Sequence, residues 1–507
     1  MNINCKYYKK DGEDFICTHK EQIPLNKIVF EDECKECGGN LDLSEYKEVR
    51  EECIEVEIGK NNKPTYKINI SPVVNFLINK FSFKTVYATK HEEIYVYSGG
   101  IYILKGREVI QASIEKILGQ HCTNHFVREI EEKIKRQTVI SREDFDNIPE
   151  ELICLNNGIL NLKTQQFLEE HDPKYLFRKK INITFDKTKK CNLIEKFLSD
   201  VLYPEHIPII QEWFGYNLYR RYFIKKALIL FGGQDTGKSV LVNLLSTFIG
   251  HGNFGGLSLQ TISSGDKFAL ASLYQMYSNI KDDLQSGDLI SGGFKEATGG
   301  SWLTAEKKFG DRFSFLCYAK HTFTANKIPS LKNIDVEDSA YYMRWLPIPL
   351  DNKIETKDQD KFLIDKLTAK DELSGLLNWA LIGLKRLLDK GVFSYNKTVD
   401  EIRLIMEKHG DSLSAFVQDI LIREDGNKIT KQYMYELYTL YINSLKPIPA
   451  MLSKEQIGRK LNKYATYIIA KHKGKVRYWD NVNLNLVNIK SQIGTDTFDT
   501  FTKTLCN

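Results

Sequence analysis

The chain has 507 residues, of which 42% are hydrophobic and 11% aromatic, so it is long enough for three or four domains that each bury a core. The 71 Lys and Arg residues against 66 Asp and Glu residues leave a formal net charge of +5, which is too small to indicate a partner by itself. No run of eighteen apolar residues occurs and the first residues contain no apolar signal core, so we expect a soluble, cytoplasmic protein with no membrane partner.

Cysteines near the amino end predict a small zinc site. Cys34 and Cys37 form a C-x-x-C-G-G knuckle, which can hold two thiolates of a tetrahedral zinc ion on one turn. Cys5 and Cys17 would complete the site, with His19 as the alternative to Cys5. We expect a zinc ribbon near the start of the chain; the alternative is a loop-rich segment with four reduced cysteines.

The region that follows mixes short strands with amphipathic helices. Hairpins are predicted over Ile94 to Leu104 and around the turn pair Asn157-Gly158. A helix is predicted over Val127 to Thr138. Asp144 and Asp146 could bind a metal, as in a primase or polymerase, but an acidic loop at a helix start is the favoured interpretation because no companion ligand pattern follows.

A strand, a glycine-rich loop and a helix follow one another between Ala227 and Phe248. The loop matches G-x-x-x-x-G-K-[ST], whose backbone N–H groups cradle phosphates at a helix start. Lys238 would reach the β and γ phosphates of ATP, and the Ser239 hydroxyl would bind Mg²⁺. The residues predicted to bind the nucleotide are Gly232, Gly233, Gln234, Asp235, Thr236, Gly237, Lys238 and Ser239.

Candidate partners for this loop lie further along the chain. Asp282 and Asp283 could hold Mg²⁺ and polarise the attacking water, although an exposed loop pair is an equally good interpretation of the two letters alone. A Gly-Gly turn precedes two β-like arms around a basic tip with Lys307, Lys308 and Arg312. Asn326 ends the next predicted strand, where it could hydrogen-bond the water or the γ phosphate.

The carboxyl-terminal part carries its own basic pattern. We expect a long helix over Lys370 to Gly391, a linker over 407–412, and then a helix capped by Thr430 and a second helix with a capping box at Ser453. A hairpin with a basic tip follows. Helix, helix and basic hairpin predict a winged-helix DNA-binding module, and a solvated hairpin is the alternative. The predicted DNA contacts are Arg459, Lys460, Lys471, Lys473, Lys475 and Arg477.

The order of these motifs resembles the superfamily 3 helicases of viruses, phages and plasmids. The shared features are the phosphate loop, the acidic pair, the Gly-Gly hairpin, "TAN-x-x-P" and "A-x-x-x-R-W-x-x-I-P", and the nearest group is the phage and poxvirus-type primase-helicase carboxyl-terminal module. The resemblance is strongest over 150–350. This chain departs from the family at Asp283, where Glu is common, at Ser301, where Asp often follows the Gly pair, and at Met343, where a second Arg is frequent.

The resemblance implies roles for several residues. Lys238, Asp282, Asp283 and Asn326 would form the ATPase centre, and Arg344 would be an arginine finger that reaches a neighbouring subunit's γ phosphate. Lys307 and Lys308 would lie on a channel hairpin that grips single-stranded DNA. The implied fold is a multidomain α/β and α+β protein with an AAA+ core.

We expect a zinc ribbon, an α+β domain, an ATPase domain, a helical segment, a winged helix and a tail, with the boundaries 1–45, 46–190, 191–365, 366–410, 411–490 and 491–507. The expected function is an ATP-dependent replicative DNA helicase of a virus or mobile element, using ATP, Mg²⁺ and Zn²⁺. Its partners would be single- and double-stranded DNA, further copies in a hexamer, and a primase or polymerase of the same replicon. The alternatives are an ATP-switched initiator or loader that does not unwind DNA, and a bifunctional primase-helicase.

Overall fold

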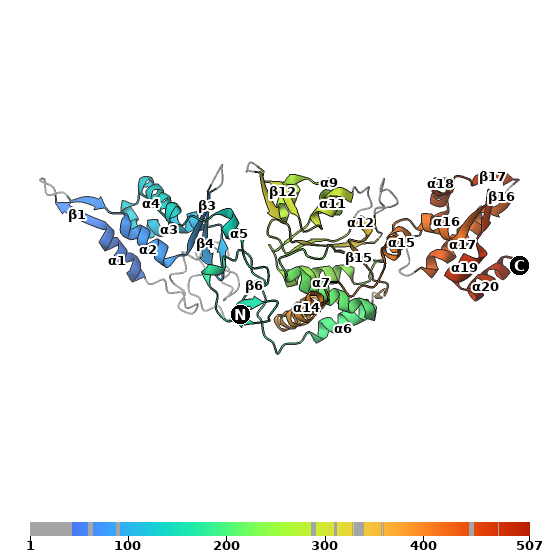
Figure 1. Cartoon of the computed structure of the whole chain (residues 1–507), viewed down its shortest axis with the longest axis horizontal. Helices are drawn as coiled ribbons and strands as arrows, with labels where there is room; N and C mark the ends of the chain where they lie inside the picture. Colours follow the sequence, from blue (N-terminus) through green and yellow to red (C-terminus); the bar gives the residue numbers. More distant parts are fainter. Residues whose placement is uncertain are drawn as a thin grey trace. The chain divides into compact units, whose positions relative to one another are not determined.

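The computed structural model describes residues 43–58, 64–87, 92–284, 291–308, 312–326, 328, 339–355, 357, 359–445, 451–474 and 476–506 (Figure 1). Cys5, Cys17, His19, Cys34, Cys37 and Lys475 lie outside these residues, so the predicted zinc ribbon stays a prediction. The chain divides into two compact units, one with Met1–Cys154 and Leu168–Lys180 and the other with Leu155–Phe167 and Ile181–Asn507.

In the first unit, helices pack on a small antiparallel sheet. Its strands follow the order β3-β4-β5, and the buried side chains of Val73, Leu77, Ile114 and Ile134 join the helices in one core. The hairpin predicted over Ile94 to Leu104 is confirmed, with the turn at Gly99. The elements are α1 (Leu43–Cys53), β1 (Ile54–Ile58), β2 (Pro64–Ile68), α2 (Ser71–Lys80), β3 (Phe83–Tyr87), β4 (Glu92–Ser98), β5 (Ile101–Ile103), α3 (Gly106–Leu118), η1 (Gly119–His121), α4 (Asn124–Gln137), α5 (Arg142–Asp146) and η2 (Pro173–Tyr175).

A small three-stranded sheet, in the order β6-β7-β8, contains the hairpin predicted around Asn157-Gly158. Its strands are β6 (Leu152–Leu155), β7 (Gly158–Asn161) and β8 (Phe167–Leu168). The helical segment that follows is interrupted at Pro204, which has no backbone N–H and opens a separate turn. This stretch comprises α6 (Asn192–Val201), η3 (Pro204–His206) and α7 (Ile207–Leu218).

The second unit is built on a five-stranded parallel sheet in the order β10-β11-β14-β9-β15. Every residue of β9 is buried, as expected for a central strand covered on both faces. The elements are β9 (Ala227–Phe231), α8 (Lys238–Ile249), β10 (Phe254–Gly255), α9 (Leu259–Ser264), α10 (Lys267–Leu270), η4 (Ala271–Leu273), β11 (Ser278–Lys281), α11 (Ser291–Ala297), β12 (Trp302–Glu306), β13 (Arg312–Leu316), β14 (Lys320–Ala325), α12 (Ser339–Tyr342), β15 (Trp345–Pro349), α13 (Leu363–Leu367), α14 (Lys370–Lys390) and α15 (Val399–Gly410).

Helices α7 and α14 pack closely against each other within this unit (Figure 1). A Cβ atom added to Gly215 on α7 would lie 2.4 Å from the Ala380 carbonyl oxygen, so only glycine fits this crossing. Buried Glu212 accepts a hydrogen bond from Arg386 Nε at 2.6 Å across the same contact. The long helix predicted over Lys370 to Gly391 is confirmed as α14. Its packing holds α7, which precedes the sheet, in place.

The predicted linker at 407–412 is wrong. Helix α15 continues to Gly410, and Asp411 then caps α16 by accepting hydrogen bonds from the backbone N–H groups of Leu413 and Ser414, both at 3.2 Å. His409 is buried and its ring lies 4.9 Å from that of Phe231, so this segment packs into the fold. The polar residues of 407–412 therefore form the junction between α15 and α16.

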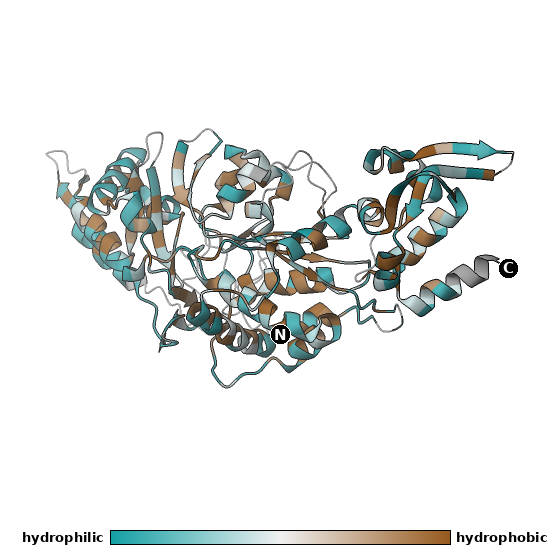
Figure 2. Cartoon of the chain, turned by 45° about the vertical axis from the view of Figure 1, so that its right-hand side comes forward, coloured by the Kyte–Doolittle hydropathy of each residue, from teal (hydrophilic) through white to brown (hydrophobic). Residues whose placement is uncertain are grey.

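The last part of the chain has a separate hydrophobic core. Its sheet has the antiparallel order β16-β18-β17, of which the predicted hairpin supplies two strands. In Figure 2 the outer part of the β17–β18 hairpin is largely hydrophilic. Phe498, in the expected tail, belongs to this core and is 4% exposed. The elements are α16 (Ser412–Ile420), β16 (Leu421–Thr430), α17 (Lys431–Ser444), α18 (Lys454–Tyr464), β17 (Ile469–Lys473), β18 (Val476–Leu484), α19 (Leu486–Ile493) and α20 (Thr495–Cys506).

Candidate nucleotide site at the carboxyl edge of the sheet

The phosphate loop lies where the sequence predicts it, between the end of β9 and the start of α8. Gly232 has φ +150°, and a Cβ atom there would lie 2.1 Å from the Leu350 carbonyl oxygen, so no other residue fits without moving the backbone. Gly237 adopts φ +86° at the N-cap of α8. The loop therefore places the start of α8, where backbone N–H groups have no partner within the helix, at the carboxyl edge of the sheet.

The Lys238 ammonium is held at the mouth of this loop. Its Nζ donates to the Gly232 carbonyl at 3.1 Å, to Thr236 Oγ1 at 3.3 Å, and to the Gly233 carbonyl. Burial lowers the pKa of Lys238, and the carboxylates of Asp282, Asp235 and Asp283 act against that shift. A buried ammonium near neutral carbonyls gains most from an anionic ligand, which fits the predicted phosphate contact.

The acidic pair lies at the same edge, after β11. Thr324 on the neighbouring strand β14 donates from Oγ1 to Asp282 Oδ1 and accepts from the Asp283 backbone N–H at 2.8 Å. Asp283 has φ +53°, in the left-handed region. Thr324 is 1% exposed, so the hydroxyl fixes both acidic residues from inside the sheet. No motif in the sequence marks Thr324, because its contact with Asp282 depends on how β11 and β14 pair.

Asn326 follows β14, which lies between β11 and β9. Ala325 pairs with Phe231, and the Gly232 N–H donates to the Ala325 carbonyl at 3.3 Å. Because the strands are parallel, their carboxyl ends meet at one edge. The structure therefore brings together four predicted positions there: Lys238, Asp282, Asp283 and Asn326.

A cleft of about 700 Å³ opens beside the phosphate loop. One wall is α6, with Phe197, Val201 and Asp200, and the other side includes Ile354 and Leu367. Apolar and polar side chains thus face a space next to Lys238 that is large enough for a nucleotide. No motif in the sequence marks α6, so this wall of the site was missed.

Arg344 lies at the opposite edge of the sheet. It directly precedes β15, whose first residue, Trp345, pairs with Ala227 at the start of β9. The Arg344 backbone carbonyl accepts a hydrogen bond from the Ala227 N–H at 2.6 Å. Nη1 of the Arg344 side chain donates to the Ala340 carbonyl. Within one chain, a five-residue strand therefore separates Arg344 from the phosphate loop, and the structure does not bring the two together.

The predicted DNA-contacting residues lie on two hairpins and a helix. On the β12–β13 hairpin, Lys307 Nζ lies 5.8 Å from the Phe313 ring, and Arg312 forms an ion pair of 3.7 Å with Glu306. On β17, Lys471 pairs with Asp480. The remaining described candidates are all exposed: Lys308 after β12, Arg459 and Lys460 on α18, Lys473 on β17 and Arg477 on β18.

Two acidic residues of the first unit have structural partners. Asp144 accepts from Ser141 Oγ at 2.6 Å at the start of α5, and Asp146 pairs with Arg178. Among the described residues there is no group of three or more His, Cys, Asp or Glu side chains that could hold a metal. Magnesium needs no such group when phosphates supply most of its ligands, so Ser239 and Asp282 at one sheet edge suit it. The described helices include none that is both long and apolar enough to span a membrane.

Two family models match separate parts of the chain. Residues 57–203 match the family model described as "D5 N terminal like", and residues 230–344 match a family of unknown function, DUF5906. The Sputnik virophage protein named "Putative helicase V13" is 23% identical over 290 residues, which are 53% of this chain and 37% of that protein. The chain thus matches little more than a third of this relative's length.

Two solved structures show more distant similarity. The apo carboxyl-terminal region of NrS-1 (305–718) is 12% identical, covers 81% of this chain and 98% of that chain, and has a TM-score of 0.44. The JCV helicase is 16% identical, covers 43% of this chain and 65% of that chain, and has a TM-score of 0.25.

Proposed function

We propose a function from the premise that this chain belongs with the phage and viral primase-helicases, a family that the D5-type match and the virophage relative support. The chain is a helicase-like replication protein of a virus or mobile element. In finer terms, we propose an ATP-driven DNA helicase of superfamily 3 with an AAA+ core, working as a hexameric ring.

The observation that carries this proposal is the shared position of the phosphate loop, the acidic pair and Asn326 at one sheet edge, beside a nucleotide-sized cleft. Such an edge suits hydrolysis of a γ phosphate, because every charged or polar group that the reaction needs can face the same point. A protein that only bound nucleotide would not need an acidic pair held by a buried threonine.

The residues then take separate roles. Lys238 binds the β and γ phosphates. Ser239 and Asp282 would hold Mg²⁺, and the bound ion would neutralise part of the phosphate charge. Asp283 and Asn326 orient the attacking water. Arg344 acts on the site of the neighbouring subunit, since it lies at the opposite end of β9 from the phosphate loop of its own chain.

DNA contacts complete the proposal. Lys307, Lys308 and Arg312 on the β12–β13 hairpin contact single-stranded DNA in the ring. The α16–α20 module, which we assign as a winged helix, binds duplex DNA through α18 and the β17–β18 hairpin. The four cysteines near the start are proposed to hold Zn²⁺, and a primase or polymerase of the same replicon remains a proposed partner.

The test measures ATP hydrolysis with and without single-stranded DNA, and displacement of a labelled strand from a forked duplex. We expect DNA-stimulated hydrolysis and ATP-dependent displacement, with both lost in Lys238→Ala. DNA-stimulated hydrolysis without displacement would instead favour an initiator or loader, and primer synthesis on a single-stranded template would indicate a primase-helicase. Absence of a ring in electron micrographs of the purified protein would remove the hexamer from the proposal.

A further inference from the structure

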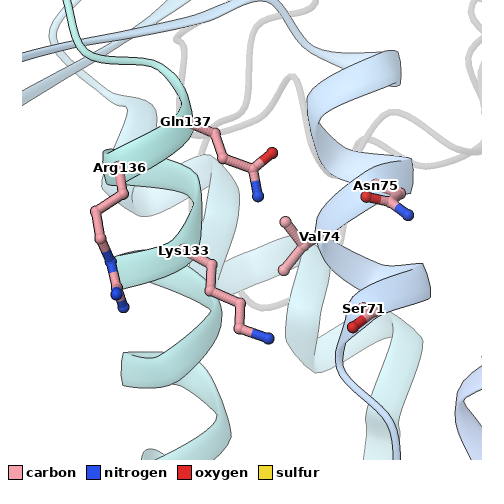
Figure 3. A pocket seen from close by; sticks show the side chains of 6 residues that line it. All are labelled: Ser71, Val74, Asn75, Lys133, Arg136 and Gln137. Atoms are coloured by element: carbon pink, nitrogen blue, oxygen red, sulfur yellow. The ribbon is translucent and has the colours of Figure 1, made fainter.

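The first unit contains a cleft of about 260 Å³ between α2 and α4. Each helix presents residues at i, i+3 and i+4, so one face of each helix lines the space. Figure 3 shows Lys133 and Gln137 extending from α4 toward α2, with Val74 between the two helices. The lining consists of Ser71, Val74, Asn75, Lys133, Arg136 and Gln137.

The lining carries two positive charges and no carboxylate. In the part of the chain that the structure describes, Lys133 forms no ion pair or hydrogen bond, and Arg136 donates from Nε only to the Glu132 backbone carbonyl, at 3.1 Å. The carboxylates of α4 have partners outside the cleft. Glu129 pairs with His125 at 3.7 Å, Glu131 with Arg107 at 2.9 Å and with Lys135 at 3.2 Å, and Glu132 with Lys135 at 2.7 Å.

The helix geometry and the size of the cleft limit the ligand. Helix α2 begins at Ser71, a residue of the lining, so the positive end of the helix lies at the cleft, although the Asn69 side chain already accepts a hydrogen bond from the Ser71 backbone N–H at 3.1 Å. The volume is little more than a third of the 700 Å³ beside the phosphate loop. No aromatic ring in the lining could stack on a base. The cleft thus suits a phosphate group with its adjoining sugar and does not suit a whole nucleoside triphosphate.

We propose that this cleft binds a backbone phosphate of single-stranded DNA, through Lys133 and Arg136, with Ser71 and the side-chain amides as further donors. The site lies in a different unit from the proposed ATPase centre and from the basic hairpins, so it adds a further DNA contact to the two already proposed. The proposal of a phosphate site rests on the proposed function only in its choice of DNA as the source of the phosphate.

The test uses the full chain with Lys133→Gln/Arg136→Gln, and a control pair, Lys47→Gln/Arg128→Gln, that removes the same charge from exposed positions on α1 and α4 outside the cleft. Binding of a fluorescent thirty-residue oligo-dT is measured by anisotropy over a range of salt. Loss of one phosphate contact should lower the salt slope by about 0.7, and affinity should fall roughly tenfold at low salt. The control pair should change affinity less than about twofold, and basal ATP hydrolysis should not change in either variant.

Two further measurements separate the outcomes. Inorganic phosphate and dTMP, at constant ionic strength, should compete poorly with oligo-dT; strong competition would identify the cleft as a site for free phosphate and overturn the DNA assignment. Equal losses of oligo-dT affinity in the two variants, or no loss in either, would overturn the proposed DNA contact in the cleft. The proposed helicase function would still stand. A wild-type chain that binds no single-stranded DNA would overturn both.

Discussion

Thr324 determines how the acidic pair is held, because its hydroxyl contacts both Asp282 and the Asp283 backbone from inside the sheet. We predict that Thr324→Val lowers the rate of ATP hydrolysis about ten- to hundredfold, since a hydrogen bond to a charged group contributes ~1.5–3 kcal/mol. Nucleotide affinity should change little, because Lys238 and the loop are unaltered. Steady-state kinetics and nucleotide titration measure the two quantities separately.

Thr322 provides the matched control. It is also buried on β14, two residues earlier, and its Oγ1 accepts a hydrogen bond from Trp213 Nε1 at 2.9 Å. Thr322→Val should cost stability without changing hydrolysis per folded molecule. Equal losses of hydrolysis in the two variants would show that Thr324 has only a structural role.

His321 gives the stability of the parallel-sheet core a pH dependence. Burial lowers its pKa to about 4, whereas in the unfolded chain the value is about 6.5, so the unfolded state takes up a proton first as the pH falls. The stability that neutral His321 contributes is complete above pH 6.5 and is lost progressively toward pH 4. We predict that the midpoint of thermal unfolding falls between pH 7 and pH 5, and that it falls less in His321→Phe. The exposed His472→Gln should keep the wild-type pH slope.

For single residues, the sequence predicts well those sites whose members are close together along the chain. The spacing of Gly232, Gly237 and Lys238 is local, so the phosphate loop could be identified before the fold was known. Thr324 was missed because its contact with Asp282 depends on the register between β11 and β14, which one sequence does not reveal. The wall formed by α6 was missed for another reason: no motif in the sequence marks this helix as part of the site.

At the scale of elements, boundaries with a side-chain cap were predicted well. Thr430 and Ser453 cap α17 and α18 as expected, and Ser453 with Gln456 forms the predicted capping box. Composition was a poorer guide, because it indicated a linker where α15 and α16 join. Strand β16 was also missed; its residues are mostly exposed, so alternation of apolar side chains gives no signal there.

The β17–β18 hairpin allows a test of DNA binding by the last module. Lys473 and Arg477 are exposed, whereas Lys471 is held by Asp480. We predict that Lys473→Ala/Arg477→Ala lowers the salt slope of duplex binding by about 1.8, at about 0.9 per phosphate contact, and leaves basal ATP hydrolysis unchanged. Lys471→Ala should have a smaller effect. Filter binding at several salt concentrations measures the slope, and an unchanged slope would identify the hairpin as a solvated surface.

For the whole molecule, the position of Arg344 makes assembly testable. Because Arg344 lies at the sheet edge away from its own phosphate loop, the proposed role in hydrolysis requires a neighbouring subunit's site. We predict that Arg344→Ala strongly lowers hydrolysis with little change in nucleotide affinity, and that Lys238→Ala loses both. Mixing the two inactive proteins should restore part of the activity, since some interfaces then combine an intact loop with an intact arginine.

Exchange of subunits must be demonstrated in the same mixture, for example by energy transfer between differently labelled chains. With exchange shown, complete absence of recovery would contradict a site shared between subunits. A variant that unfolds at a lower temperature and gives no recovery would assign Arg344 to the packing around Ala340.

Helix α6 has a consequence for how this protein can be divided. The "D5 N terminal like" match ends at 203 and so includes α6, yet α6 belongs to the second compact unit and lines the cleft beside Lys238. The matched segment and the second compact unit therefore overlap over 155–167 and 181–203, which include β7 and α6. A fragment that begins at 204 should bind nucleotide more weakly than one that begins at 181, and a gene fusion that exchanges the two matched regions between relatives would replace one wall of the cleft without the other.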